Sequence, residues 1–230
     1  MLDPTRVRAI SLDLDDTLWP IWPTIERAER ALAAWLGQQA PLTAALFANP
    51  QARQSLREHV VQTRPELGHD LSAIRREAIR LALYRAGENP LLADAAFEVF
   101  FAERHNVDLF ADALPALQWL AQRYPVVALS NGNADVGRVG LGEWFTASVS
   151  AATFGVGKPA VGIFHAAAQA AGVAAEDVLH VGDDAHLDVL GALSAGMQTV
   201  WVNRDAQAWA HAPQPHCTVM QLTELCDLLA

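Results

Sequence analysis

The sequence predicts an α/β protein in which a doubly wound parallel sheet is interrupted by an inserted block of helices. Short apolar segments alternate with helical segments from residue 112 to residue 230, which is typical of parallel strand–helix–strand units. One further strand-like segment lies near the N-terminus, and residues 20–111 separate it from the others with helical periodicity alone. Hydrophobic residues make up 52% of the chain and charged residues 18%, so a folded core is expected rather than disorder.

The first expected strand covers residues 7–14, where a short apolar run ends in acidic residues. Pro20 and Pro23 are then expected to break the chain. The helical periodicity that follows is divided by Pro, Gly and Asn residues, and Thr24 is a candidate N-cap for its first helix. The expected helices are residues 25–36, 51–63, 71–86 and 91–104. Since no strand pattern occurs among them, these segments predict a compact helical bundle.

After Asp112 the pattern changes to strands that alternate with helices. The expected strands are residues 126–129, 147–150, 178–181 and 199–202. The expected helices are residues 114–123, 163–171, 187–195 and 220–229. Together with the first strand, they predict a Rossmann-like core formed by residues 1–19 and 112–230, with residues 20–111 inserted as a helical cap.

The formal net charge is −10 and the isoelectric point is near 5.1, which argues against nucleic acid and anionic membranes as partners. The two cysteines, Cys217 and Cys226, form neither a disulfide framework nor a zinc-ligand set. No signal peptide is evident, and no apolar run reaches the length of about 18 residues that spans a bilayer. We therefore expect a soluble cytoplasmic protein, monomeric or homodimeric, that acts on a small molecule.

Three of the expected strands end in polar residues, at positions 13–17, 130–132 and 182–184. In open α/β sheets, ligands bind outside the carboxyl ends of the strands, so these segments are expected to meet in one crevice. Lys158, in a segment with few other charges, is expected to approach the crevice from a loop. His180, inside an apolar strand, is expected to be a core histidine.

Asp13 and Asp15 are two positions apart in an extended segment, so their side chains are expected to point the same way. Two carboxylates that face one site repel each other unless a cation or a shared proton lies between them. Mg²⁺ is the expected cation, because it prefers oxygen ligands; one carboxylate can then attack phosphorus while the other transfers protons. Helix capping and solvation are the alternative explanation. Asp183 would complete the metal site, with Asp188 as an indirect ligand or as a carboxylate favoured by a helix N-terminus.

A phosphate site on an acidic protein must be made locally positive. Ser130 offers a hydroxyl donor, and Asn131 and Gly132 offer backbone N–H groups. Lys158 offers a point charge that suits both phosphate and a carboxylate nucleophile. Phosphoryl transfer depends mainly on positioning and charge neutralisation, and this set supplies both. The residues therefore predict catalysis on a phosphate ester.

In order along the chain, these motifs are Asp13-x-Asp15-x-Thr17, Ser130, Lys158 and Gly182-Asp183-x-x-x-x-Asp188. They resemble the four motifs of the haloacid dehalogenase (HAD) superfamily of hydrolases. The resemblance implies a HAD-like core, Asp13 as the nucleophile that forms an aspartyl phosphate, and Asp15 as the acid and base. It also implies Mg²⁺ held by Asp13, the backbone carbonyl of Asp15 and Asp183, with a hinge to the cap at residues 16–20. Dehalogenase members lack the second Asp of the first motif, so Asp15 favours phosphate chemistry.

Several segments show a closer similarity to one group within that superfamily. This group consists of bacterial phosphatases that act on flavin mononucleotide (FMN) or on the riboflavin precursor 5-amino-6-(5-phospho-D-ribitylamino)uracil. These segments are residues 13–18, 130–133, 140–142 and 180–184, with residues 65–66 and 69–70 in the cap. The two compounds are therefore the expected substrates. The alternatives are phosphoglycolate, nucleotides or sugar phosphates as substrates, a phosphomutase, and a catalytically silent binding protein.

Other prominent side chains are expected to have structural and not catalytic roles. Trp19 and Trp22 are expected to pack near the hinge, with stacking on a flavin-like ring as the alternative. Arg75, Arg76 and Arg80 are expected on a solvated face of a cap helix, with a substrate clamp as the alternative.

Overall fold

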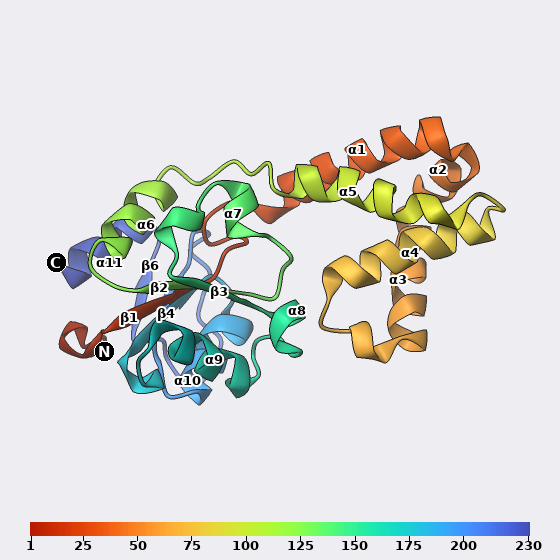
Figure 1. The fold of residues 1–230 in the computed structure, drawn as a ribbon. Coiled ribbons are helices and arrows are strands. Elements are labelled where there is room, and N and C mark those ends of the chain that lie inside the picture. Colours follow the sequence, from red (N-terminus) through yellow and green to blue (C-terminus); the bar gives the residue numbers. More distant parts are fainter. The chain divides into compact units, whose positions relative to one another are not determined.

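The computed structural model describes all 230 residues, which divide into two compact units (Figure 1). The sheet unit comprises Met1–Pro20 and Asp108–Ala230, and the helical unit comprises Ile21–Val107. Relative to the expected boundaries, Pro20 and residues 108–111 therefore belong to the sheet unit. The expected role of the helical unit as a cap stays a prediction.

The sheet unit is built on six parallel strands in the order β3-β2-β1-β4-β5-β6. The strands are β1 (Ala9–Leu12), β2 (Val126–Ser130), β3 (Ala147–Ser150), β4 (Val178–Gly182), β5 (Gln198–Val202) and β6 (Cys217–Val219). The chain moves outward from β1 first in one direction and then in the other, so the expected doubly wound α/β class is confirmed. Edge strand β6 was not expected, because only Val219 of its three residues is buried.

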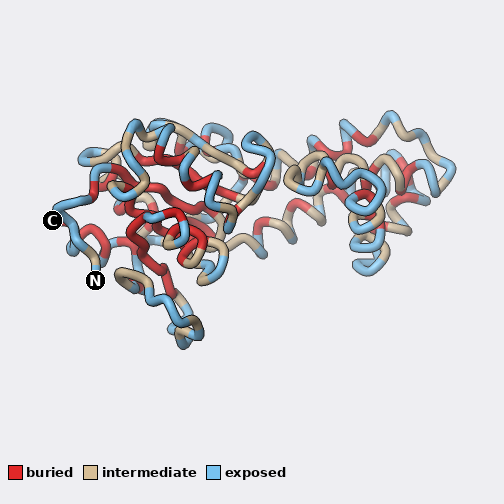
Figure 2. Tube along the Cα trace, turned by 90° about the horizontal axis from the view of Figure 1, so that it is seen from below, coloured by how far each residue is buried: buried red, intermediate tan, exposed pale blue.

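Helices cover both faces of this sheet (Figure 1). The helices α9 (Val161–Ala171) and α10 (Gly191–Ser194) lie on one face, and α6 (Ala113–Ala121) and α11 (Leu222–Leu229) lie on the other. Because both faces are covered, every residue of β1, β2, β4 and β5 is buried. Figure 2 shows these buried segments running through the interior of the unit.

The segment after β4 differs from the single helix expected at residues 187–195. A π-helical turn, η6, covers Ala185–Leu190 and leads directly into α10. The carbonyl oxygen of Asp184 accepts from the N–H of Asp188 at 3.0 Å and from the N–H of Val189 at 3.2 Å. The second bond spans five residues, so the turn holds one residue more than an α-helical turn, a feature that is frequent at functional sites.

The remaining elements of the sheet unit are short. They are the 3₁₀ turns η1 (Pro4–Arg6), η4 (Gly142–Trp144) and η5 (Ala175–Asp177) and the helices α7 (Val136–Val139) and α8 (Ala151–Phe154). The strand expected at residues 147–150 is confirmed as β3. Ser150 ends this strand and caps α8, since its hydroxyl accepts from the N–H of Thr153 at 3.2 Å.

The helical unit contains five α-helices around one apolar core. They are α1 (Ile21–Gln39), α2 (Pro41–Phe47), α3 (Pro50–Thr63), α4 (Leu71–Arg85) and α5 (Ala93–Arg104), with the 3₁₀ turns η2 (Pro65–Leu67) and η3 (Pro90–Leu92). The core includes the buried side chains of Leu32, Ile79 and Phe97. None of the helices in either unit has the length and apolar character that a membrane crossing requires.

Two prolines of the helical unit lie in the first turn of a helix instead of breaking the chain. Helix α1 starts at Ile21 and includes Pro23, so the expected break there is wrong, and the helix continues past Gly37 to Gln39. Pro41 opens α2, a helix that was not expected. Both prolines lie in a first turn, where backbone N–H groups have no partner within the helix and the missing N–H is tolerated.

Candidate active site

The carboxyl ends of neighbouring strands carry the residues of the candidate site. In the sheet, Leu12 of β1 lies level with Ala128 of β2 and with Val181 of β4. Asp13 follows Leu12, and its N–H donates to the carbonyl oxygen of Val181 at 2.9 Å. Ser130 ends β2 two positions beyond Ala128. The polar ends of these strands therefore lie together at one edge of the sheet, as expected.

The ammonium group of Lys158 lies between two carboxylates. Its Nζ atom is 2.5 Å from Oδ1 of Asp13 and 2.5 Å from Oδ1 of Asp188. All three residues are buried. Lys158 comes from the loop between α8 and α9, so the lysine lies where the sequence predicted it. The two contacts fix Nζ beside the carboxylate of Asp13.

Asp188 is held in turn by a buried histidine. Oδ1 of Asp188 lies 3.1 Å from Nε2 of His180, and Nδ1 of His180 lies 3.0 Å from the hydroxyl oxygen of Ser11. The ring of Phe164 packs edge-on against His180, with 5.1 Å between the ring centroids. His180 is therefore a core histidine, as expected, but it also orients the carboxylate that holds Lys158.

Gly182 and the π turn bring Asp188 into the site. A Cβ atom on Gly182 would lie 2.4 Å from Cγ of Asp188, so only glycine leaves room for this carboxylate. The second oxygen of Asp188, Oδ2, accepts from the N–H of Asp184 at 3.0 Å. The spacing of the Gly-Asp-x-x-x-x-Asp motif thus follows from one local packing arrangement.

Thr17 joins two carboxylates that come from different strand ends. Its Oγ1 atom lies 3.1 Å from Oδ1 of Asp183 and 3.4 Å from Oδ2 of Asp13. One carboxylate oxygen each from Asp13, Asp183 and Asp188 lies within 4.8 Å of the other two. The indole N–H of Trp201 donates to the main-chain carbonyl oxygen of Asp183 at 2.7 Å, which fixes the end of β4. Three of the four expected metal ligands are therefore brought together.

The carboxylates of this cluster do not titrate like exposed ones. Burial raises the pKa of Asp13 well above its ordinary value, an effect that Lys158 opposes and the other two carboxylates increase. Burial and the charge of Asp188 raise the pKa of Asp183 to about 7. For Asp188 itself burial is outweighed by Lys158 and by His180, so its pKa is lowered. Burial would lower the pKa of Lys158, but its two carboxylate partners raise it.

The charges of the cluster fit a bound divalent cation. Three carboxylates face one ammonium group, so the fully ionised site carries excess negative charge in a buried place. The raised pKa values of Asp13 and Asp183 have this physical cause together with burial. A hard divalent cation would remove the excess, and the donor atoms are the oxygens that Mg²⁺ prefers.

The carboxylate of Asp15 does not belong to this cluster. Its Oδ1 atom accepts from the indole N–H of Trp19 at 2.9 Å, and Trp19 is fully buried, which fits the expected packing role of this tryptophan. Asp16 adopts a left-handed backbone with φ 59°, and its N–H donates to the carbonyl oxygen of Trp19 at 2.7 Å. The chain thus turns sharply after Asp15. The expected parts of Asp15, as acid and base and as a carbonyl ligand, stay predictions.

The second motif contributes through a side chain that the sequence did not single out. The carboxamide of Asn131 accepts from the N–H of Lys158 at 2.6 Å and donates to the carbonyl oxygen of Lys158 at 2.8 Å. A Cβ atom on Gly157 would lie 2.5 Å from Oδ1 of Asn131, so glycine is needed at this position. Ser130 is buried, and its Oγ accepts from the N–H of Gly132 at 2.9 Å. That N–H, expected to bind phosphate, is therefore engaged, whereas the Ser130 hydroxyl keeps its own proton to donate.

Comparison with known proteins identifies the family. The model of the haloacid dehalogenase-like hydrolases matches residues 7–196, which is most of the chain. The chain belongs to the haloacid dehalogenase-like hydrolase family. The resemblance read from the four motifs is therefore confirmed. This hydrolase carries three of the motifs at the strand ends described above and the third, Lys158, in the loop before α9.

Three similar proteins narrow the class of this hydrolase. It is 34% identical over 232 residues to the 5-amino-6-(5-phospho-D-ribitylamino)uracil phosphatase YigB of Escherichia coli, with 97% of each chain covered. It is 32% identical over 248 residues to the phosphoserine phosphatase of Thermus thermophilus, with 95% of this chain and 98% of the relative covered. A solved structure described as a 2-haloacid dehalogenase from Pseudomonas syringae pv. Tomato matches with a TM-score of 0.92 at 36% identity, covering 97% of this chain and 98% of that one. The family and the phosphatase relatives confirm the expected enzyme class, a phosphoric monoester hydrolase.

Several residues that shape the site of this hydrolase were not assigned a role from the sequence. Thr17 belongs to the first motif, and its place there is the sequence signal for its role. Ser11 and His180 are polar residues in strands that are otherwise apolar, and that contrast was a usable signal. The side chain of Asn131 carried no such signal, because its partner is 27 residues away in another loop.

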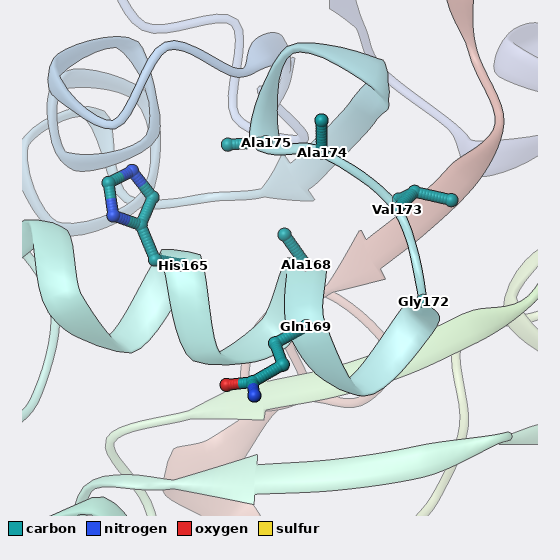
Figure 3. A pocket seen from close by; sticks show the side chains of 7 residues that line it. All are labelled: His165, Ala168, Gln169, Gly172, Val173, Ala174 and Ala175. Carbon is teal, nitrogen blue, oxygen red and sulfur yellow. The ribbon is translucent and has the colours of Figure 1, made fainter.

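A separate hollow lies along α9 of this hydrolase, away from the motif residues. Figure 3 shows its lining, which includes His165, Gln169 and Val173. Nε2 of His165 lies 3.1 Å from the carbonyl oxygen of Ala195. None of the expected site residues lines this hollow, so it has no part in the chemistry described here.

Proposed function

We propose that the chain is a Mg²⁺-dependent phosphomonoesterase that works through an aspartyl phosphate on Asp13. One observation carries the proposal: the buried Asp13 carboxylate is held by Lys158 at 2.5 Å and lies within 4.8 Å of the oxygens of Asp183 and Asp188. A carboxylate fixed beside an ammonium group and a cation site is suited to attack a phosphoryl group, whose negative charge must be neutralised.

In the first step, a carboxylate oxygen of Asp13 attacks phosphorus, and the bond between phosphorus and the ester oxygen breaks. Asp15 gives a proton to the leaving oxygen, so the alcohol departs neutral. In the second step, Asp15 takes a proton from water, the water oxygen attacks phosphorus, and the bond between phosphorus and Asp13 breaks. Inorganic phosphate leaves, and both carboxylates return to their starting forms.

The other residues hold the phosphoryl group and the nucleophile in place. Lys158 keeps Asp13 oriented and neutralises charge on the phosphoryl oxygens, and the Ser130 hydroxyl donates a hydrogen bond to one of them. Asp188 positions Lys158 through Oδ1, while its Oδ2 accepts from the N–H of Asp184. In this proposal, Asp188 contributes to the metal site indirectly, by holding Lys158 in place.

Asp13, Asp183 and the backbone carbonyl of Asp15 would hold the magnesium ion. When bound, Mg²⁺ supplies positive charge for the transferring phosphoryl oxygens and removes the repulsion among the buried carboxylates. Asp13 then stays ionised and available as a nucleophile, although burial alone raises its pKa.

FMN and 5-amino-6-(5-phospho-D-ribitylamino)uracil are the proposed substrates. Support comes from the 34% identity over nearly full length to the E. coli phosphatase named for the second compound. Phosphoserine is the first alternative, because the T. thermophilus relative is named for it. Phosphoglycolate, nucleotides and sugar phosphates complete the substrate panel, and a phosphomutase is the alternative reaction.

Dehalogenation of a 2-haloacid is the second candidate function, because the 36% identical solved structure carries that description. The same Asp13 would attack carbon instead of phosphorus. A halide needs no proton in order to leave, whereas an alkoxide does. Asp15 therefore has a clear use only in the phosphatase reaction.

The test measures phosphate release from the substrate panel and chloride release from 2-chloropropionate, with and without Mg²⁺. We expect Mg²⁺-dependent phosphate release that falls at least about 10³-fold in the Asp13→Asn variant. The Asp15→Asn variant separates the two chemistries, because it should lose phosphate release and would keep chloride release. A lead of more than about 10-fold in kcat/KM for the two flavin-related compounds, or ~1.4 kcal/mol, supports the proposed substrates. Chloride release without phosphate release would overturn the proposal.

A further inference from the structure

The helical unit contains a hollow of about 800 Å³ that lies wholly within residues 21–107. Helices α1 and α3 supply most of its wall, which combines apolar and charged side chains. The wall includes Trp22, Ile25, Glu29, Arg53, Arg57 and Arg75. A hollow of this volume can hold a small organic molecule.

Three arginines of the hollow share one carboxylate. Arg75 pairs with Oε1 of Glu29, Nη1 of Arg57 lies 3.9 Å from the same oxygen, and Nε of Arg53 lies 3.8 Å from Oε2. Only 16% of the Arg75 side chain and 18% of the Glu29 side chain is exposed. Three positive charges against one negative charge leave a surplus of two in the wall of the hollow.

A second group of arginines in the same unit carries no such surplus. Its members are Arg64, Arg76, Arg80, Glu66, Glu77 and Asp94. Here three arginines face three carboxylates, so the charges balance. This balanced group fits the expected solvated face for Arg76 and Arg80, whereas Arg75 turns toward Glu29. In a chain of net charge −10, an unbalanced positive cluster in a hollow is unusual.

The surroundings of Arg75 make an added anion favourable. Burial lowers the pKa of the Arg75 guanidinium, Glu29 opposes this effect, and the charge of Arg57 adds to it. The guanidinium also lies 3.6 Å from the centroid of the Phe100 ring. Charges that are partly removed from water interact more strongly, so an anion placed among these arginines would be held more firmly than one on an open surface.

We propose that this hollow is a binding site for a small aromatic acid, a molecule with a flat ring and a carboxylate or phosphate group. The acid group would pair with Arg53 and Arg57, whose distances from Glu29, 3.8 and 3.9 Å, are longer than hydrogen bonds and leave donor N–H groups available. Nη1 of Arg53 also donates to the carbonyl oxygen of Phe47, which orients its guanidinium group. The ring would lie against Ile25 and Trp22, and 72% of Trp22 is exposed. The site goes beyond the proposed phosphatase reaction, because it uses none of the residues around Asp13.

The probe is 4-nitrobenzylphosphonate, which has a phosphorus–carbon bond in place of the ester and a nitroaromatic ring that quenches tryptophan fluorescence. The full-length protein is titrated in chelator by calorimetry and by fluorescence. We expect one site whose affinity falls at least about 10-fold when Arg53→Ala and Arg57→Ala are combined. In the Trp22→Phe variant, binding by calorimetry persists while most of the quenching is lost.

Matched variants distinguish binding at this site from a general effect of charge and from binding at the phosphate site of the core. Combining Arg76→Ala with Arg80→Ala removes the same charge from the balanced group and should leave the affinity within about 2-fold. Ser130→Ala alters the phosphate site of the core and should leave this binding unchanged. Circular dichroism checks folding, and Arg57→Gln, at the most exposed of the three arginines, replaces the double variant if that variant does not fold. The proposal is overturned if the wild type does not bind, if the Arg53 and Arg57 changes leave affinity unaltered, or if either control abolishes it.

Discussion

The side chain of Asn131 makes two hydrogen bonds with the backbone of Lys158: its carboxamide accepts from the Lys158 N–H at 2.6 Å and donates to the Lys158 carbonyl oxygen at 2.8 Å. The two residues come from different loops, one after β2 and one before α9. The position of the lysine at Asp13 therefore depends on a side chain that touches neither carboxylate.

The Asn131→Ala variant should lose activity while keeping its fold. Without the carboxamide, the loop that carries Lys158 is free to shift, and a displacement of about 1 Å can cost about 100-fold in rate. We expect kcat to fall between about 10-fold and 100-fold, with KM changed much less. Gly157→Ala is the matched variant, because its Cβ would press on Oδ1 of Asn131 at 2.5 Å. Steady-state kinetics at saturating Mg²⁺ measures both; an Asn131→Ala enzyme with wild-type kcat would contradict the role.

Lys158→Met should destabilise the protein in a pH-dependent way. The variant leaves Asp13 and Asp188 buried without their shared cation, which costs about 3–5 kcal/mol when both stay ionised. Without the lysine, the folded-state pKa of Asp13 rises further above its unfolded value, and the pKa of Asp188 loses the largest of the influences that lower it. Protonation therefore supports the folded state at low pH, and this support is lost as pH rises through the folded-state pKa.

The measurement for Lys158→Met is urea unfolding in chelator at pH 5 and pH 8. We expect the loss of unfolding free energy relative to wild type to be larger at pH 8. Lys158→Arg keeps the charge and serves as the control. If the loss of unfolding free energy is the same at both pH values, lost packing and not uncompensated charge is its cause.

The strands and their polar ends could be predicted because alternation of apolar and helical segments is a local property of the sequence. This alternation is enough to find three site residues, because each lies at or next to the end of a strand: Asp13, Ser130 and Asp183. The hydrogen bonds between Asn131 and the backbone of Lys158 could not be predicted, because they depend on how two loops pack against each other. The π turn before α10 and the proline-containing start of α1 depend on local geometry that residue periodicity does not record.

Binding of Mg²⁺ should weaken as pH falls below 7. Burial and the charge of Asp188 raise the pKa of Asp183 to about 7, so the metal-free protein holds a proton there at lower pH, and the ion must displace it. One displaced proton corresponds to about a 10-fold rise in apparent Kd per pH unit below that pKa. Calorimetry in two buffers of different ionisation enthalpy counts the protons released. Equal Kd values at pH 6 and pH 8 would contradict the prediction, and Asp183→Asn, which lacks the titrating ligand, should bind weakly at both.

Ser11 and His180 should affect turnover through Asp188 alone. The Ser11 hydroxyl contacts Nδ1 of His180 at 3.0 Å, and Nε2 contacts Asp188 at 3.1 Å, so Ser11 fixes which ring nitrogen donates to the carboxylate. Burial lowers the pKa of His180, which keeps the ring neutral and makes this choice of tautomer matter. Ser11→Ala should lower the unfolding free energy by about 1 kcal/mol and reduce kcat by a few-fold.

A double-mutant cycle checks that chain of contacts. Ser11→Ala and Asp188→Asn are made singly and together, and kcat is measured for each. If Ser11 acts only by orienting His180 toward Asp188, its effect on kcat should largely disappear in the Asp188→Asn background, because the carboxylate that it helps to orient is gone. Additive effects on kcat would mean that Ser11 acts by another route, such as the packing of β1 against α9.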